Sequence, residues 1–356
     1  MNLIIQTCIP DYRLKVYNYI LEKDKSVKII AGDEYYTASI KSVKSLQNVI
    51  WIDNLFFLNR KFLIQKLPWE KIFRAQNIVI EFNLRNISFY LVLFSRLLLG
   101  KKTYLWGHAW SRAGKKSKSE YLRFIFKKIS SGYIAYTNEQ AKELKLQLVN
   151  KRIFSASNAI YYKKEMMPLN MDESEITNFV YVGRLVKEKK PLFMVQAFQK
   201  TIKRLPSDTK LFIIGSGPEQ KIIEEFVKQN DLEERVIVYG HISNYDKLRH
   251  IYSTSIASIS PGYVGLSITQ SLGFGVPMII SKDEPHSPEL EAAIIGENSE
   301  YFKTDNVDDL AEILCSFYSK KTQWFMKRDE ISKKCRNMYS VEKMAEPFLN
   351  ILKVEK

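Results

Sequence analysis

Cysteine is scarce in this sequence of 356 residues, which contains Cys8, Cys315 and Cys335 and no others. Three widely separated cysteines exclude a disulfide framework and a cysteine-rich zinc site, and they are typical of a protein in a reducing compartment. No His, Cys and carboxylate residues recur at metal-ligand spacing, and no Asp-x-Asp lies between apolar strands. We therefore expect neither a bound metal nor a cofactor.

Long apolar runs are absent as well. The longest, Ile87–Leu99, is interrupted by two serines and Arg96 and is too short to span a bilayer. The first residues, Met1–Gln6, lack the basic segment and the long apolar stretch of a secretory signal. We therefore expect a cytoplasmic protein that does not cross a membrane, although it can still bind to the surface of one.

Charge is distributed unevenly along the chain. The sequence has 54 Lys and Arg against 39 Asp and Glu, a formal net charge of +15. Residues 1–170 hold 29 basic and 12 acidic side chains, whereas residues 171–356 hold 25 and 27. The basic character thus belongs to the first half, and we expect the two halves to face different partners. An excess of this kind suits nucleic acid, an anionic membrane or a phosphorylated small molecule.

Short β-branched or aromatic runs alternate with segments of helical apolar spacing through the whole chain. The predicted strands are residues 3–7, 27–31, 49–52, 78–81, 103–107, 133–136, 153–157, 179–183, 211–215, 236–240, 256–260 and 278–281. Alternation of this kind, with nearly continuous apolar strands, predicts parallel sheets covered by helices on both faces. The expected fold class is α/β.

The strands fall into two groups separated by a polar segment near residues 162–178. We expect two doubly wound, Rossmann-like domains, at residues 1–165 and 175–338. The tail, residues 339–356, has helical apolar spacing, and Pro347 is expected to kink or split that helix.

Four predicted strands of the second half end in small residues: Gly183, Gly215, Gly240 and Ser260-Pro261-Gly262. In open α/β sheets the ligand lies beyond the carboxyl ends of the strands, where small residues let the backbone approach it. Arg184 and Lys189 follow the first of these strands, at the start of a predicted helix whose N-terminus already favours anions. Two cations at this place suit a diphosphate.

Four motifs of the second half occur in the order and spacing of the retaining family 4 glycosyltransferases. They are Gly183-Arg184-Leu185-x4-Lys190-Pro191 and the segments 213–219, 236–242 and 260–280. The chain resembles this family over residues 178–300, and more faintly through Pro10-Asp11-Tyr12-Arg13 and Leu105-Trp106-Gly107-His108. The resemblance implies the GT-B architecture, in which two Rossmann-like domains face a cleft and a C-terminal helix crosses back to the first domain.

The resemblance also implies roles for the matching residues. Arg184 and Lys189 match the pair that neutralises the donor diphosphate, and His108 matches a histidine that positions the donor sugar. The implied donor-binding residues are Gly183, Gly215, His241, Gly265, Leu266, Ser267 and Gln270. Arg13 would contact phosphate in place of the family's missing glycine-rich loop, and His286 would begin a helix near the cleft.

Two positions depart from the family pattern. Where the family usually has two glutamates, one near the sugar and one on the ribose hydroxyls, this chain has Gly262 and Gln270. Gln270 keeps hydrogen-bonding capacity without charge, whereas Gly262 offers no side chain. We interpret the pair as a bacterial variant of the site. It leaves open a non-catalytic GT-B protein that binds a nucleotide sugar or a glycan.

The charge of the first half is highest in residues 101–170, which hold 15 basic and 4 acidic side chains among aromatic and aliphatic ones. This composition suits an anionic bilayer surface, and also single-stranded nucleic acid. No helix-turn-helix, RRM or KH signature supports nucleic acid. Lipid-linked glycans are the usual acceptors of bacterial enzymes similar to this one. We therefore expect an anionic inner-membrane surface as a partner, and no nucleic acid.

The sequence thus predicts a metal-independent, retaining hexosyltransferase. It would move a sugar from a UDP- or GDP-sugar to a lipid-linked or growing surface glycan, in capsule, O-antigen or exopolysaccharide synthesis. The expected place is the inner face of the cell membrane, as a peripheral protein. Besides the binding protein, a nucleotide-sugar epimerase is an alternative, although the acidic and histidine residues that such an enzyme needs in its cleft are not found.

Overall fold

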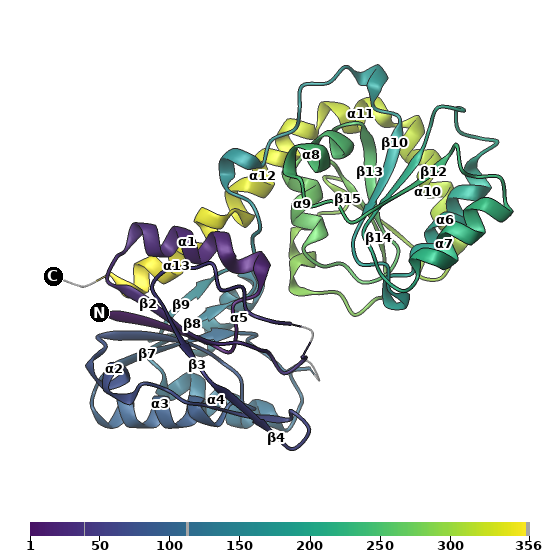
Figure 1. The fold of residues 1–356 in the computed structure, drawn as a ribbon. Coiled ribbons are helices and arrows are strands. Elements are labelled where there is room, and N and C mark those ends of the chain that lie inside the picture. The colour runs from purple at the N-terminus through teal and green to yellow at the C-terminus, as the bar shows by residue number, and fades with distance from the viewer. Residues whose placement is uncertain (39, 112–113, 354–356) are drawn as a thin grey trace. The chain divides into compact units, whose positions relative to one another are not determined.

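A computed structural model describes residues 1–38, 40–111 and 114–353. They form two compact units: the first is Met1–Ile160 together with the segment that begins at Val341, and the second is Tyr161–Ser340. Each unit is a parallel sheet with helices packed against it, as Figure 1 shows. The predicted class, α/β with two Rossmann-like domains, is confirmed.

The sheet of the first unit has seven strands in the order β3-β2-β1-β6-β7-β8-β9, and every neighbouring pair is parallel. The strands are β1 (Asn2–Gln6), β2 (Val27–Gly32), β3 (Val49–Ile52), β6 (Asn77–Glu81), β7 (Lys102–Gly107), β8 (Gly132–Ala135) and β9 (Arg152–Ser155). The order reverses between β1 and β6. A small antiparallel hairpin, which the sequence analysis did not predict, joins β4 (Asn54–Phe57) to β5 (Phe62–Gln65).

The core of the first unit lies between this sheet and a layer of helices. Its members include Ile5, Ile78 and Leu105 of the strands and Phe89, Phe126 and Leu144 of the helices. The helices of this unit are α1 (Leu14–Lys23), α2 (Trp69–Arg74), α3 (Ile87–Leu98), α4 (Ser119–Ile129), α5 (Asn138–Gln147) and α13 (Val341–Leu352), with a 3-10 turn η1 (Asp11–Arg13).

The C-terminal helix α13 packs within the first unit, as expected of a helix that crosses back. It lies against α1, β6 and β9, and the ring of Phe348 meets that of Trp106 edge-on at 4.8 Å. The expectation that Pro347 splits this helix is wrong, because α13 runs unbroken through it. Proline removes one helical hydrogen bond, whereas the helix buries Met344, Phe348 and further apolar residues on one face.

The sheet of the second unit has six parallel strands in the order β12-β11-β10-β13-β14-β15, which reverses between β10 and β13. The strands are β10 (Asn178–Val182), β11 (Leu211–Ile214), β12 (Val236–Gly240), β13 (Ser255–Ser260), β14 (Met278–Ser281) and β15 (Ser299–Phe302). The last of these was not predicted. This order is that of a dinucleotide-binding Rossmann fold.

The helices of the second unit are α6 (Pro191–Thr201), α7 (Gln220–Gln229), α8 (Tyr245–Ser253), α9 (Ser267–Gly273), α10 (Val307–Ser319), α11 (Lys321–Met326) and α12 (Arg328–Tyr339). Short 3-10 turns are η2 (Lys163–Glu165), η3 (Glu173–Glu175), η4 (Lys187–Lys189) and η5 (Pro288–Ala292). Across the described parts of both units, no helix has the length and apolar character needed to cross a membrane.

Candidate functional site

The first and fourth predicted motifs meet at the reversal of strand order in the second unit. Strand β10 ends at Val182 and β13 ends at Ser260, and these two strands are hydrogen-bonded neighbours. The crevice beyond the carboxyl ends of two such strands is where doubly wound sheets bind ligands. The loops that begin at Gly183 and Pro261 therefore form the candidate site.

The glycines of the second motif hold the first loop in place. A Cβ at Gly215 would lie 1.8 Å from the carbonyl oxygen of Gly183, and one at Gly217 would lie 2.3 Å from that of Leu185. Both glycines also have positive φ, a conformation that residues with a side chain rarely adopt. The amide of Leu185 donates to the carbonyl of Ser216 at 3.0 Å. The chain after β11 thus sets the position of the residues beside Arg184.

Gly262 is required by the backbone that it touches. A Cβ there would lie 2.3 Å from the carbonyl oxygen of Glu188 and 2.8 Å from the Cα of Lys189. The loop after β13 therefore lies directly on η4, the turn that carries Lys189. This close approach leaves no room for the glutamate that the family usually places at this position.

Arg184 and Lys189 both bind Tyr263. The Nη2 of the exposed Arg184 donates to the phenol oxygen of Tyr263 at 3.0 Å. The Nζ of Lys189 donates to the main-chain carbonyl of Tyr263 and lies 3.4 Å from the centre of its ring. The structure thus brings the two predicted catalytic cations together. The sequence analysis gave Tyr263 no role, although its position between Gly262 and Gly265 could have indicated that it lies in the ligand-binding loop.

Lys189 lies in surroundings that disfavour its own charge. Burial lowers its pKa to about 8, and repulsion from Arg184 acts in the same direction, whereas Glu289 opposes it. A partly buried ammonium next to a guanidinium gains more from a bound anion than a solvated lysine does. The pair is therefore suited to a diphosphate.

The neighbouring Lys190 has a structural role that differs from that of Lys189. Its ammonium pairs with Glu284 Oε1 at 2.6 Å and with Asp305 Oδ1 at 2.5 Å. Burial lowers the pKa of Lys190, but the hydrogen bonds that its ammonium donates to these two carboxylates outweigh burial and raise the pKa. Lys190 therefore ties the start of α6 to the loops after β14 and β15, and its charge is already balanced.

His286 is a support for the loop at 261–266. The buried amide of Val264 donates to its Nδ1 at 2.9 Å, and its Nε2 lies 3.0 Å from the carbonyl oxygen of Ser281. These partners assign a neutral ring with the proton on Nε2, and burial lowers the pKa of the ring. The amide of Ser287 donates back to the carbonyl of Val264 at 3.0 Å. Both ring nitrogens are thus engaged inside the protein.

We expect His286→Ala to weaken the fold and the site together. The variant leaves the buried amide of Val264 without its acceptor, which should lower the free energy of unfolding by about 1–3 kcal/mol. Displacement of the loop should lower kcat/KM for the donor by about 10- to 100-fold. Urea unfolding and steady-state kinetics measure the two effects, with His250→Ala on the exposed face of α8 as control. Unchanged kinetics would contradict the assigned support.

The other predicted donor-binding residues of the second unit lie in contrasting environments. Gln270 is buried in α9, where its Nε2 donates to the hydroxyl of Tyr161 at 2.8 Å and its Oε1 accepts from Tyr252 at 3.4 Å. Its predicted ribose contact stays a prediction. His241 is exposed after β12, the outer strand of the sheet. Gly265, Leu266 and Ser267 form the entry to α9, and the Nζ of Lys189 lies 3.8 Å from the Cβ position of Gly265.

In the first unit, Arg13 and His108 meet at Tyr136. Arg13 is buried; its Nη1 donates to Gln6 Oε1 at 3.1 Å and its Nη2 to the hydroxyl of Tyr136 at 3.0 Å. Its guanidinium also stacks on the ring of Trp106, 4.4 Å from the centroid. The partly buried His108 packs edge-on against Tyr136, with ring centres 4.7 Å apart. Their predicted ligand contacts stay predictions.

Glu81, which the sequence analysis also left without a role, lies at the reversal of strand order in the first unit. It ends β6, and its Oε2 accepts from the amide of Thr7, just beyond β1, at 2.9 Å. The sequence feature that could have identified Glu81 is a single carboxylate at the end of an otherwise apolar strand. Among the described residues of either unit, no three His, Cys, Asp or Glu side chains gather as metal ligands would.

Comparison with known proteins finds both related sequences and similar folds. Residues 169–338 match the profile of the family described as Glycosyl transferases group 1. The N-acetyl-alpha-D-glucosaminyl L-malate synthase of Bacillus anthracis is 29% identical over 156 residues, which are 42% of this chain and 39% of the relative. The chain thus spans well under half of the length of this curated relative.

Two solved structures are similar over nearly the whole of both chains. A glycosyltransferase from Rickettsia africae ESF-5 gives a TM-score of 0.70 at 14% identity and covers 99% of this chain and 97% of its own. Anabaena Alr3699/HepE in complex with UDP gives 0.66 at 12% identity and covers 99% of each. At these identities the likeness establishes the fold.

Proposed function

Because the chain resembles the family 4 glycosyltransferases of the GT-B fold, and its second unit matches the group 1 profile, we propose that it transfers a sugar from a nucleotide-sugar donor. The observation that carries this proposal is the meeting of Arg184 and Lys189 on Tyr263, at the strand reversal where such sheets bind ligands. The proposed reaction is a hexosyl transfer with retention of the anomeric configuration.

In this reaction Arg184 and Lys189 stabilise the leaving nucleoside diphosphate. Negative charge accumulates on the diphosphate as the glycosidic bond breaks, and two prepositioned cations bind that charge more strongly in the transition state than in the ground state. These two side chains supply the charge that a divalent metal supplies in other transferases. We therefore propose that the transfer needs no added metal. His108 would hold the donor sugar rather than act as a base.

Two structural neighbours in complex with UDP support a UDP-sugar as the donor. One structural neighbour is the pneumococcal O-GlcNAc transferase GtfA in complex with UDP and GlcNAc, with a TM-score of 0.63 at 14% identity, covering 99% of this chain and 98% of its own. The name of the Bacillus anthracis relative also specifies an N-acetylglucosaminyl group. For this chain we propose a UDP-hexose, with a GDP-sugar as the next candidate.

The basic first unit supports an anionic, membrane-held acceptor. We propose a lipid-linked or growing surface glycan, on the inner face of the cell membrane, in capsule, O-antigen or exopolysaccharide synthesis. The cations expected to face it differ in part from those of the sequence analysis. Lys127 is fully buried and bonds the carbonyl of Ala109, and Arg123 lies beside Glu120 and the carbonyl of His108. Arg112, another of the basic residues within 101–170, falls outside the described residues.

The test is a thermal-shift screen of UDP- and GDP-sugars, followed by transfer to lipid-linked acceptors with and without EDTA. A donor at about 100 times its Kd should stabilise the fold by about 2.7 kcal/mol. Transfer that survives EDTA and yields a product with the donor's anomeric configuration supports the proposal. If no donor raises the melting temperature, the assignment fails.

A non-catalytic binding protein is the second candidate function. Where the family usually has two carboxylates, this chain has Gly262 and Gln270, whose buried side chain makes two hydrogen bonds inside the protein. This observation favours the binding protein. Donor binding without hydrolysis or transfer, across the acceptor panel, would select this candidate over the enzyme.

Donor affinity should fall as the pH rises above about 8. Lys189 binds the diphosphate in its protonated form, and its pKa of about 8 places the loss of that proton in an accessible range. The association constant for UDP should therefore fall by up to about tenfold per pH unit above this value. Calorimetry between about pH 7 and pH 9 measures it, with Lys189→Arg as control, because a guanidinium stays charged throughout. An equal slope in both proteins would contradict the role of Lys189.

A further inference from the structure

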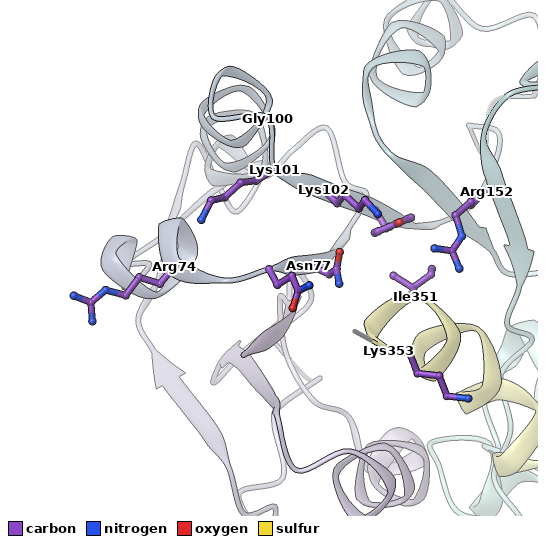
Figure 2. A pocket seen from close by; sticks show the side chains of 10 residues that line it. Arg74, Asn77, Gly100, Lys101, Lys102, Arg152, Ile351 and Lys353 are labelled. Carbon is purple, nitrogen blue, oxygen red and sulfur yellow. The ribbon is translucent and has the colours of Figure 1, made fainter. Parts of the chain in front are cut away.

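The first unit contains a cavity of about 410 Å³ with a basic lining. Its walls are Arg74, Gln76, Asn77, Gly100, Lys101, Lys102, Tyr104, Arg152, Ile351 and Lys353. Within the described part of the chain, five of these ten lining residues are cationic and none is acidic. In the view of Figure 2, Lys102 and Arg152 lie on the side of the pocket where Ile351 is, and Arg74 and Lys101 lie farther from Ile351. We call this cavity the basic pocket.

The basic pocket is separate from the groups assigned to sugar transfer in the same unit. Asn77, Lys102 and Arg152 are the first residues of β6, β7 and β9, so the pocket lies at the amino ends of parallel strands. His108 follows the carboxyl end of β7. The two sites therefore lie at opposite ends of the strands of one sheet. The pocket thus serves a ligand other than the reacting sugar.

The buried side chain of Arg96 ties together the backbone that carries part of the pocket wall. The guanidinium of Arg96 donates to the carbonyl oxygens of residues 72, 75, 76 and 102 and to the hydroxyl of Thr103, at 2.7–3.0 Å. These bonds hold the end of α2 and the start of β7 around the end of α3. The hydrogen bonds of Arg96 thus fix the backbone that carries the cations Arg74, Lys101 and Lys102.

Three of the lining cations have contacts that can be traced in the structure. Lys101 donates to the carbonyl of Phe73, and Arg152 donates to that of Asn350 at 3.3 Å, so these two bonds involve no carboxylate. Arg74 pairs with Glu70 of its own helix, outside the lining. A concave site of this size, with several cations and amide groups, recognises a phosphate group.

Exposed apolar residues adjoin the basic pocket along the chain. Leu97, Leu98 and Leu99 are 47%, 87% and 55% exposed, and Gly100 and Lys101 of the pocket wall follow directly. Phe73, beside Arg74, is 39% exposed. Apolar side chains that project next to a cluster of cations are the pattern of a protein that docks on an anionic bilayer. A soluble phosphate ligand would give no reason for the leucines.

We propose that the basic pocket binds the phosphate of an anionic lipid headgroup, with Leu98 and Leu99 entering the acyl boundary of the same leaflet. Charge complementarity and the adjoining leucines select a lipid over a free phosphate compound. The proposal gives the membrane partner of the proposed function a defined site and rests on that function for its purpose. The binding itself is measured without any sugar.

The test compares flotation with phosphatidylcholine vesicles that do or do not contain phosphatidylglycerol. The triple variant Lys101→Gln, Lys102→Gln, Arg152→Gln should lower the partition coefficient on anionic vesicles by about 10²-fold. Its control is Lys25→Gln, Lys142→Gln, Lys145→Gln, which removes three exposed cations elsewhere in the first unit and should have a much smaller effect. Equal losses in the two triples would overturn the pocket in favour of diffuse surface charge.

The leucines are tested in the same assay. Leu98→Ser with Leu99→Ser should lower binding to anionic vesicles by about tenfold or more, because apolar burial in the membrane is lost. The control Leu146→Ser with Val149→Ser alters two residues of the same unit that are 83% and 81% exposed, and should change binding little. Wild-type binding in the leucine double variant would overturn the proposed insertion.

Two further measurements separate the remaining outcomes. Saturable calorimetric binding of inorganic phosphate by a protein that does not float with anionic vesicles would overturn the lipid assignment. UDP binding and melting temperature, measured on every variant, should match the wild type, which shows that the fold and donor site are intact. Vesicle binding without any donor binding would instead sink the proposed function and leave the basic pocket in place.

Discussion

Lys189→Met is expected to lower kcat/KM for sugar transfer by about 10²–10³-fold while making the protein more stable. The rate falls because one of two prepositioned cations is lost from the leaving diphosphate. The stability rises because the folded state disfavours the ammonium: burial lowers the pKa of Lys189 to about 8, so the charged form present at neutral pH is the penalised one. Steady-state kinetics and thermal melting at neutral pH measure the two effects.

The opposite signs of these effects distinguish a binding role from a structural one. With the pKa lowered on folding, wild-type stability should increase as the pH rises through about 8, and this increase should be absent in the variant. Lys187→Met, in the same turn η4 but at an exposed position, is the matched control and should change neither rate nor melting temperature appreciably. A destabilised Lys189→Met protein would show that the lysine serves the fold.

The fold followed from the sequence because buried parallel strands have a strong signature. Strands at 49–52, 236–240 and 278–281 were predicted with the bounds that the structure has, since each is a short apolar run between turn residues. The hairpin of β4 and β5 was missed. Exposure alternates along β5 but not along β4. In the connection between the two strands, Leu58, Asn59 and Arg60 adopt positive φ, and no glycine marks this turn in the sequence.

The candidate site was predicted in part, and the reason differs from residue to residue. Arg184 and Lys189 are charged residues that follow the end of a predicted strand, and this position can be recognised from the sequence pattern alone. The bonds of Tyr263 and of His286 depend on which loops touch in space, and neither spacing nor composition encodes that contact.

The basic cluster was predicted less accurately than the donor motifs. Lys127 and Arg123 lie among other cations in the sequence, yet both turn inward to carbonyl oxygens and to Glu120. Burial lowers the pKa of Lys127 to about 8. A local count of charges cannot distinguish a solvated lysine from one whose ammonium is buried against a carbonyl oxygen, as that of Lys127 is. The basic pocket lies at the amino ends of the strands, whereas His108 follows the carboxyl end of β7.

Gly262→Glu, which restores the residue that the family usually has, is expected to abolish most of the activity rather than increase it. The new Cβ would lie 2.3 Å from the carbonyl oxygen of Glu188, so the loop after β13 and the turn η4 must move apart. The free energy of unfolding should fall by about 1–3 kcal/mol, as in other overpacked sites. Because η4 carries Lys189, the same movement separates that ammonium from the carbonyl of Tyr263.

Urea unfolding and transfer kinetics test this prediction with two companion variants. Gly262→Ala adds only the clashing Cβ and should already cause most of the loss. Gly265→Ala, three residues on, should keep its stability, because its Cβ would meet no atom closer than the Lys189 Nζ at 3.8 Å. If Gly262→Glu instead folded normally and transferred sugar faster, the site could still accommodate the family's glutamate, and the prediction would be wrong. If the prediction holds, the backbone contact between the two loops has replaced the carboxylate, and the whole donor site depends on it.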